Sequence, residues 1–229
     1  MAADQAPAEP LPFVEPFGDR AVLITLATEA TDATAARAQA VARRIRADRR
    51  WGAVVPAATS ILVHLWIPSR ELGVDPAAEL GRLAALREPG DETWPEESPT
   101  VEIPVRYGGA GGPDLEALAA TTGLTPAQLI EAHAGTTYRA QFLGFAPGFA
   151  YLGPLPIELV APRRPSPRVH VPAGSVAIAG PYTAVYPIDS PGGWHLVGRT
   201  AVRVWDPARQ PPALLEAGTI VRFVPETGR

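Results

Sequence analysis

The chain has 229 residues, of which 46% are apolar and 19% charged, and its formal net charge is −4. This composition indicates a folded protein of one or two domains, and its acidic balance argues against general nucleic-acid binding. Cysteine and lysine are both absent from the sequence, which excludes disulfides, thiolate nucleophiles, Schiff-base lysines and P-loop lysines.

The first 90 residues alternate strand-like and helix-like segments. Strands are predicted over 20–26, 52–57 and 60–67, and helices over 31–48 and 75–87. Asp75 is a suitable cap for the second helix, because Pro76 follows it at the first helical position. The order β-α-β-β-α resembles a split β-α-β unit, so we predict a small ferredoxin-like α/β domain over residues 1–90.

The remainder of the chain is predicted to be a β-rich domain. Residues 91–100 are acidic and contain prolines, and we interpret them as a linker to a second domain over 101–229. In that domain strands are predicted over 100–107, 138–142, 175–179, 183–186, 195–198, 202–205 and 220–224, and short helices over 114–122 and 125–133. Many short strands between proline and glycine turns are typical of a barrel or a sandwich.

An aromatic, glycine-rich segment stands out at residues 144–153, with the sequence GFAPGFAYLG. Glycine and proline interrupt any regular strand here, so Phe145, Phe149 and Tyr151 are expected on a loop. Two interpretations stay open: the rings plug one end of the barrel, or they form the apolar wall of a small-molecule pocket.

A second segment, residues 161–175, gathers Arg163, Arg164 and Arg168 between prolines. The prolines stiffen the backbone, and the arginine fork suits carboxylate or phosphate groups. These arginines are therefore either anion ligands for a small acidic molecule or surface arginines paired with the chain's own carboxylates.

Two weaker signals leave alternatives open. The glycine-rich run 108–112 between a strand and a helix forms either a simple turn or a phosphate cradle. His133 is either a packing residue or a base for proton transfer. The four histidines are too far apart in the sequence to suggest a metal site, and none is predicted.

No apolar run reaches the ~20 residues of a membrane span and no signal peptide is evident, so we expect a cytoplasmic protein without a membrane partner.

Six segments together resemble one known family. The runs at 144–153, 162–180 and 186–200, supported by 17–24, 55–63 and 103–119, resemble the family of the 5-oxoprolinase B subunit, also called PxpB, KipI-like or allophanate hydrolase subunit 1. One departure is Gly218-Thr219, where the family usually has Gly-Asp before the last strand. The resemblance implies an α+β protein with a cyclophilin-like β-barrel after the α/β domain.

The resemblance also implies a function and candidate residues. It implies that this chain is one component, inactive alone, of an enzyme that opens the ring of 5-oxo-L-proline to give L-glutamate. The A and C subunits are the other components, and the C subunit contains a homologous barrel. ATP with Mg would be held by the assembled complex. The expected catalytic residues are His133, Arg163 and Arg168, and the expected substrate-binding residues are Phe145, Pro147, Phe149, Tyr151, Ser175 and Tyr186.

Two other functions remain open within the same family. One is a protein that binds and inhibits a sensor histidine kinase. The other is a component of a related allophanate or amide hydrolase. The aromatic and arginine-rich segments favour an enzyme component over a pure inhibitor, because an inhibitor has little need of a polar, ring-lined pocket.

Overall fold

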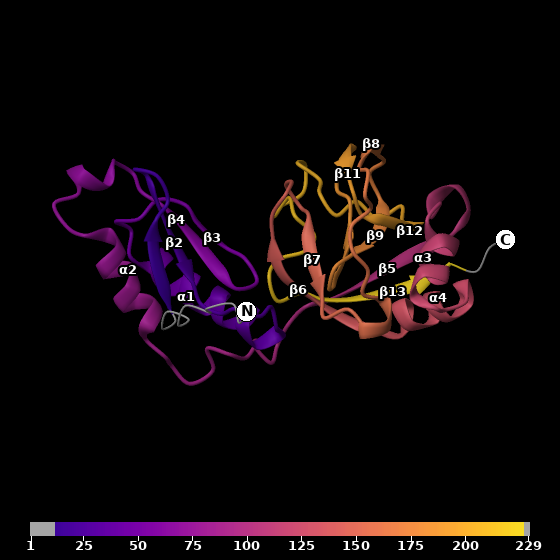
Figure 1. The fold of residues 1–229 in the computed structure, drawn as a ribbon, viewed down its shortest axis with the longest axis horizontal. Helices are drawn as coiled ribbons and strands as arrows, with labels where there is room; N and C mark the ends of the chain where they lie inside the picture. The colour runs from indigo at the N-terminus through magenta and orange to yellow at the C-terminus, as the bar shows by residue number, and fades with distance from the viewer. Residues whose placement is uncertain (1–11, 227–229) are drawn as a thin grey trace, which may run out of the picture. The chain divides into compact units, whose positions relative to one another are not determined.

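The structure, a computed structural model, describes residues 12–226 and divides along the chain into two compact units between Trp94 and Pro95 (Figure 1). None of the helices in this part of the chain combines the length and apolar character needed to cross a membrane.

Unit 1 is a four-stranded antiparallel sheet with two helices. The strands are β1 (Phe13–Pro16), β2 (Ala21–Thr25), β3 (Val54–Pro56) and β4 (Ser60–His64), and the helices are α1 (Asp32–Ala47) and α2 (Pro76–Ala85). The strand order is β1-β2-β4-β3. Helix α1 contacts β3 and β4, α2 contacts β1 and β2, and the helices contact each other, so together they cover one face. Ile24, Ile61 and Ile45 lie fully buried between the layers.

This strand order does not confirm the ferredoxin-like arrangement. The predicted β-α-β-β-α succession corresponds to β2, α1, β3, β4 and α2, but the structure has a further strand, β1, before it. In a ferredoxin-like unit the strand beside β2 would come after α2, whereas here β1 takes that place.

The acidic segment after α2 is attached to unit 1. Asp91, in the predicted linker, is 8% exposed, and both of its carboxylate oxygens lie 3.1 Å from Arg44 Nη2. An arginine in the last turn of α1 therefore holds the start of this segment against the helix.

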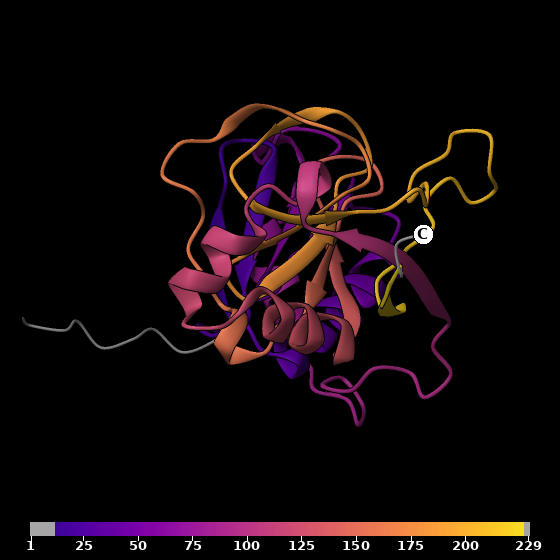
Figure 2. The ribbon, with the colours of Figure 1, turned by 90° about the vertical axis from the view of Figure 1, so that its right-hand side faces the viewer.

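Unit 2 is a closed seven-stranded barrel (Figures 1 and 2). Its order is β10-β7-β6-β13-β5-β12-β9. The strands are β5 (Thr100–Tyr107), β6 (Thr137–Leu143), β7 (Ala150–Gly153), β9 (Ser175–Ala179), β10 (Tyr182–Val185), β12 (His195–Arg199) and β13 (Ile220–Pro225). Helices α3 (Leu115–Thr122) and α4 (Pro126–Gly135) pack outside it, against β12 and β13 respectively.

In unit 2 three short strands were missed by the sequence prediction and one predicted strand is wrong. Strands β7, β8 (Arg168–Val171) and β11 (Ser190–Gly192) have three or four residues each and lie among prolines and glycines. β8 and β11 pair only with each other. Residues 202–205 form no strand, since Trp205 makes only an isolated bridge to Ala213.

His133 is fully buried in the barrel unit, where its ring stacks on Phe223 with centroids 4.6 Å apart. The Thr183 hydroxyl donates to the Ala177 carbonyl oxygen at 3.1 Å, so it accepts from His133 Nε2–H at 2.8 Å. His133 Nδ1 then accepts from the Tyr107 hydroxyl at 2.7 Å. Both ring nitrogens have partners, and burial lowers the pKa of His133 to about 3.

This burial predicts a pH-dependent stability. In the unfolded chain a histidine titrates near pH 6.5, so the unfolded state takes up a proton first as the pH falls. The contribution of His133 to stability is complete above about pH 6.5 and decreases by about 1.4 kcal/mol per pH unit between there and pH 3. The His133→Gln variant should unfold more easily at pH 7 and show a shallower decrease, measured by urea denaturation at several pH values. Parallel pH curves for the two proteins would contradict this assignment.

Candidate functional site

The predicted aromatic loop gathers its rings around Phe149. This side chain is 2% exposed and makes T-shaped contacts with Phe145, Tyr151, Tyr186 and Trp194, with centroids 5.1–5.5 Å apart. The rings come from distant parts of the chain, since Tyr186 follows β10 and Trp194 precedes β12. Edge-to-face pairs of this kind contribute about 0.5–1.5 kcal/mol each beyond the burial of area. These contacts hold the rings rigidly in place, and we call this aromatic cluster around Phe149 the floor of the site.

Phe145 lies above this floor in an unusual conformation. Its φ angle of 71° is the only positive one at a non-glycine residue among residues 12–226, and 61% of its surface is exposed. A left-handed backbone costs a bulky residue about 1–2 kcal/mol. Strain of this kind combined with an exposed ring is typical of functional positions.

Arg163 completes a small pocket over the rings. Phe145, Phe149, Tyr151, Tyr186 and Trp194 line it together with Gly192, Gly193 and Arg163, and its volume is about 70 Å³. Arg163 is its only charged lining residue, and no carboxylate among the described residues lies within 4 Å of its guanidinium. Chemically, the pocket offers an apolar surface and one uncommitted cation.

The other two arginines of the segment bind a buried carboxylate instead. Arg168 contacts both oxygens of Asp114 at 2.8 Å, and Arg164 Nη1 donates to Asp114 Oδ1 at 2.7 Å. The Leu196 N–H adds a third donor at 2.8 Å. Asp114 is 5% exposed. Burial alone would raise the pKa of Asp114, but Arg168, Leu196 and Arg164 together hold it below the usual range.

The structure thus brings five of the nine predicted site residues together. Phe145, Phe149, Tyr151, Arg163 and Tyr186 line the pocket. Four lie elsewhere: Arg168 on Asp114, His133 in the barrel interior, exposed Pro147 in the aromatic loop, and Ser175, whose hydroxyl donates to the Pro172 carbonyl oxygen.

Sequence reasoning missed two residues that shape this site. Trp194 is not among the predicted site residues, although its ring forms part of the pocket. Asp114 resembles an ordinary helix-cap residue, and its arginine partners lie 50 and 54 positions away, so no local pattern marks it. Among the described residues, no three histidine or acidic side chains gather as a metal site.

Comparisons with known proteins agree on one family. Residues 12–215 match the family described as carboxyltransferase domain, subdomain C and D. The chain is 45% identical to the B subunit of 5-oxoprolinase from Escherichia coli O157:H7 over 92% of this chain and 94% of that protein. It is 52% identical to the corresponding 5-oxoprolinase component of Bacillus subtilis (strain 168) over 54% of this chain and 52% of that protein.

A solved structure has a similar fold. The crystal structure of TTHA0988 superposes with a TM-score of 0.74 at 35% identity, covering 92% of this chain. This chain spans 40% of that longer protein.

Strain at Phe145 predicts a difference between two matched variants. Phe145→Ala and Phe145→Gly both remove the ring, but only glycine adopts a positive φ freely. We expect the glycine variant to be more stable by roughly 0.5–1 kcal/mol, after allowance for the greater freedom of glycine in the unfolded chain. Thermal and urea unfolding measure this difference, and an alanine variant of equal or greater stability would show that residue 145 is unstrained.

The buried ion pairs of Asp114 predict that removing its charge lowers the stability of the protein by an amount that depends on pH. Asp114→Asn keeps the shape of the side chain and removes the charge that Arg164 and Arg168 bind, so it should cost about 3 kcal/mol at pH 7. Because the folded pKa is lowered, the wild-type protein loses this stabilisation as the pH falls below about 4. The difference between the two proteins in urea denaturation should therefore narrow progressively as the pH falls below about 4. A gap that stays constant with pH would contradict the ion-pair explanation.

Proposed function

This chain belongs to the family of the 5-oxoprolinase B subunit, and we propose that it is the component of an ATP-dependent enzyme that hydrolyses 5-oxo-L-proline to L-glutamate together with the A and C subunits. The observation that carries the proposal is the pocket of five rings and one uncommitted arginine. The 45% identity to a 5-oxoprolinase component over 92% of the chain supports it.

The size of the pocket supports a chain that needs a partner. About 70 Å³ is well below the roughly 300–1,000 Å³ of typical small-molecule sites. Phe145 also leaves a large part of its ring exposed at the rim. We propose that the homologous barrel of the C subunit packs over this rim and completes the site, so that the present chain has no activity by itself.

The chemistry required is the activation of a poor electrophile. A lactam carbonyl resists attack by water, and ATP supplies a phosphoryl group that turns the carbonyl oxygen into a leaving group. Water then adds to the ring carbon, and the C–N bond breaks, which frees the amine and leaves the phosphoryl group on the side-chain carboxyl as an acyl phosphate. A second water hydrolyses this acyl phosphate to glutamate and phosphate. Anionic oxygens are present at each stage, in the substrate carboxylate and in the phosphoryl group.

The residues of this chain fit two parts of that task. The Arg163 guanidinium is exposed and free of carboxylate partners among residues 12–226, so it can bind an oxyanion through its fork. The floor formed by Phe149, Tyr186 and Trp194 offers an apolar surface for the lactam ring. Burial raises the pKa of Tyr186, which keeps its hydroxyl protonated as a donor.

Two predicted catalytic residues receive different roles in this proposal. Arg168 acts through Asp114 as a positioning residue, because its guanidinium is already bound to both carboxylate oxygens. His133 belongs to the hydrogen-bonded core, since it is fully buried and both ring nitrogens are occupied. We therefore assign proton transfer to neither of them.

Mg-ATP does not fit the aromatic pocket alone. Its volume of about 70 Å³ is too small for a nucleotide, and its lining contains no carboxylate for Mg. The proposal therefore leaves Mg to the assembled complex, and it places the enzyme in the cytoplasm, where ATP is available.

The test is ATP-dependent glutamate release from 5-oxoproline by the A and C subunits, with and without this chain. Activity should require its addition. Arg163→Gln should lower the rate by about tenfold or more, because a charge-assisted contact is lost, while thermal stability stays unchanged. Arg222→Gln, which removes an exposed arginine outside the pocket lining, is the matched control. Full activity of the Arg163 variant would remove this residue from the site.

Other outcomes identify the remaining alternatives. If the three chains associate but release no glutamate, the substrate is another amide, such as allophanate. If they do not associate, a protein that inhibits a histidine kinase becomes the better interpretation.

A further inference from the structure

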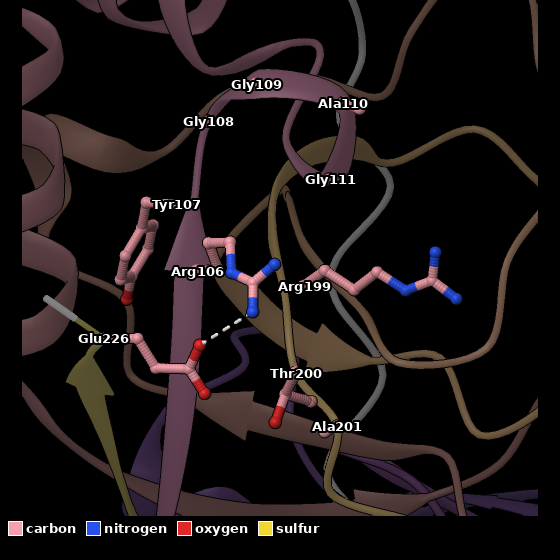
Figure 3. A pocket seen from close by; sticks show the side chains of 10 residues that line it. All are labelled: Arg106, Tyr107, Gly108, Gly109, Ala110, Gly111, Arg199, Thr200, Ala201 and Glu226. Carbon is pink, nitrogen blue, oxygen red and sulfur yellow. Dashed lines mark hydrogen bonds and ion pairs between the residues drawn. The ribbon is translucent and has the colours of Figure 1, made fainter. Parts of the chain in front are cut away.

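A second, larger cavity lies in unit 2, and it shares no lining residue with the aromatic pocket. Its volume is about 590 Å³, which is within the usual range for small-molecule sites. The wall consists of Arg106 and Tyr107 at the end of β5, the turn 108–111, Arg199 and Thr200 at the end of β12, and Glu226 (Figure 3).

Two arginines on neighbouring strands line this cavity. Arg106 and Arg199 are direct partners in the antiparallel register of β5 and β12. Like charges directly opposite one another on a ladder destabilise the pair. Such a pair is tolerable where an anion lies between the two guanidiniums.

The described residues supply a carboxylate to only one of these two arginines. Glu226 Oε2 lies 3.4 Å from Arg106 Nη2, and no carboxylate of residues 12–226 lies within 4 Å of Arg199. In Figure 3 Arg106 turns towards Glu226, while Arg199 extends away from both. Both arginines are exposed, so both guanidiniums are free to reorient. The cavity therefore has two cations and one anion.

The glycine turn is fitted closely to this strand pair. A Cβ at Gly112 would collide with the Val197 carbonyl, and one at Gly111 would lie 2.9 Å from Arg199 Cβ. The absence of side chains lets the turn lie against β12 beside Arg199. Gly109, with a φ of 55°, has nothing within 4 Å of its Cβ position, so its backbone faces open space.

We propose that this cavity binds the phosphate or polyphosphate group of a small molecule, held between Arg106 and Arg199. A phosphate has several oxygens and can contact both guanidiniums at once, and arginine binds it through two parallel hydrogen bonds. Before the ligand binds, the Glu226 carboxylate pairs with Arg106, and the phosphate then displaces this carboxylate. Thr200 and the exposed backbone of the turn complete the wall.

The test uses this chain alone, so its outcome does not depend on the proposed enzymatic activity. Isothermal titration with tripolyphosphate at low salt should show saturable binding that weakens as salt is added. Arg106→Gln and Arg199→Gln should each weaken it by about tenfold. Glu226→Gln should strengthen binding, because the competing carboxylate is removed. Arg222→Gln is the control for a general loss of positive charge.

A parallel titration identifies the source of the phosphate. If ATP binds more tightly than tripolyphosphate, the ligand is a nucleotide; if the two are equal, only the phosphate chain is recognised. The proposal is overturned if tripolyphosphate does not bind, or if Arg222→Gln weakens binding as much as the two cavity variants. It is also overturned if Glu226→Gln weakens binding, since that carboxylate would then support the site.

Discussion

The buried carboxylate of Asp114 is the interaction on which the aromatic site depends. It accepts from Arg164, Arg168 and the Leu196 N–H, and so joins the start of α3 to the loop after residue 161 and to strand β12. A buried anion is costly without partners, and here three donors compensate it. The arrangement also fixes Arg163. Arg164 points towards Asp114, and its N–H is bound to the Gly193 carbonyl oxygen at 2.8 Å. Successive side chains of an extended segment point to opposite sides, so Arg163 is directed to the pocket.

Strand β12 connects the two sites that we describe. Trp194, just before it, contributes to the aromatic pocket, and Arg199, its last residue, lines the larger cavity. Five residues of strand span about 16 Å, which is too far for one small ring to reach both. The sites also differ in character. One combines apolar rings with a single cation, and the other combines two cations with an open turn. They are suited to different parts of a reaction, or to different ligands.

Much of the fold follows from local patterns. Asp75 caps α2 as predicted, through the amides of Ala77 and Ala78, and Thr125 and Gln128 form a capping box at the start of α4. The strands over 100–107 and 175–179 lie where alternation and branched residues predict them. The aromatic segment was recognisable from its rings and glycines, although its last four residues form β7, so the prediction that Tyr151 lies on a loop was wrong. Each of these signals involves residues within about four positions of one another, so each can be read from the sequence.

What the sequence alone determined is therefore the helices and most of the longer strands, the β-rich second half, and the segments that carry Phe145, Phe149, Tyr151 and Arg163. The tertiary structure decided which of several similar residues is available. The sequence presents Arg163, Arg164 and Arg168 as equivalent, but only contact with a carboxylate 50 and 54 residues away commits two of them. It also decided that His133 is buried between Tyr107 and Thr183, and that Arg106 meets Arg199. Such pairings depend on how strands and loops close in space, and contacts of that kind leave no periodic trace in the chain.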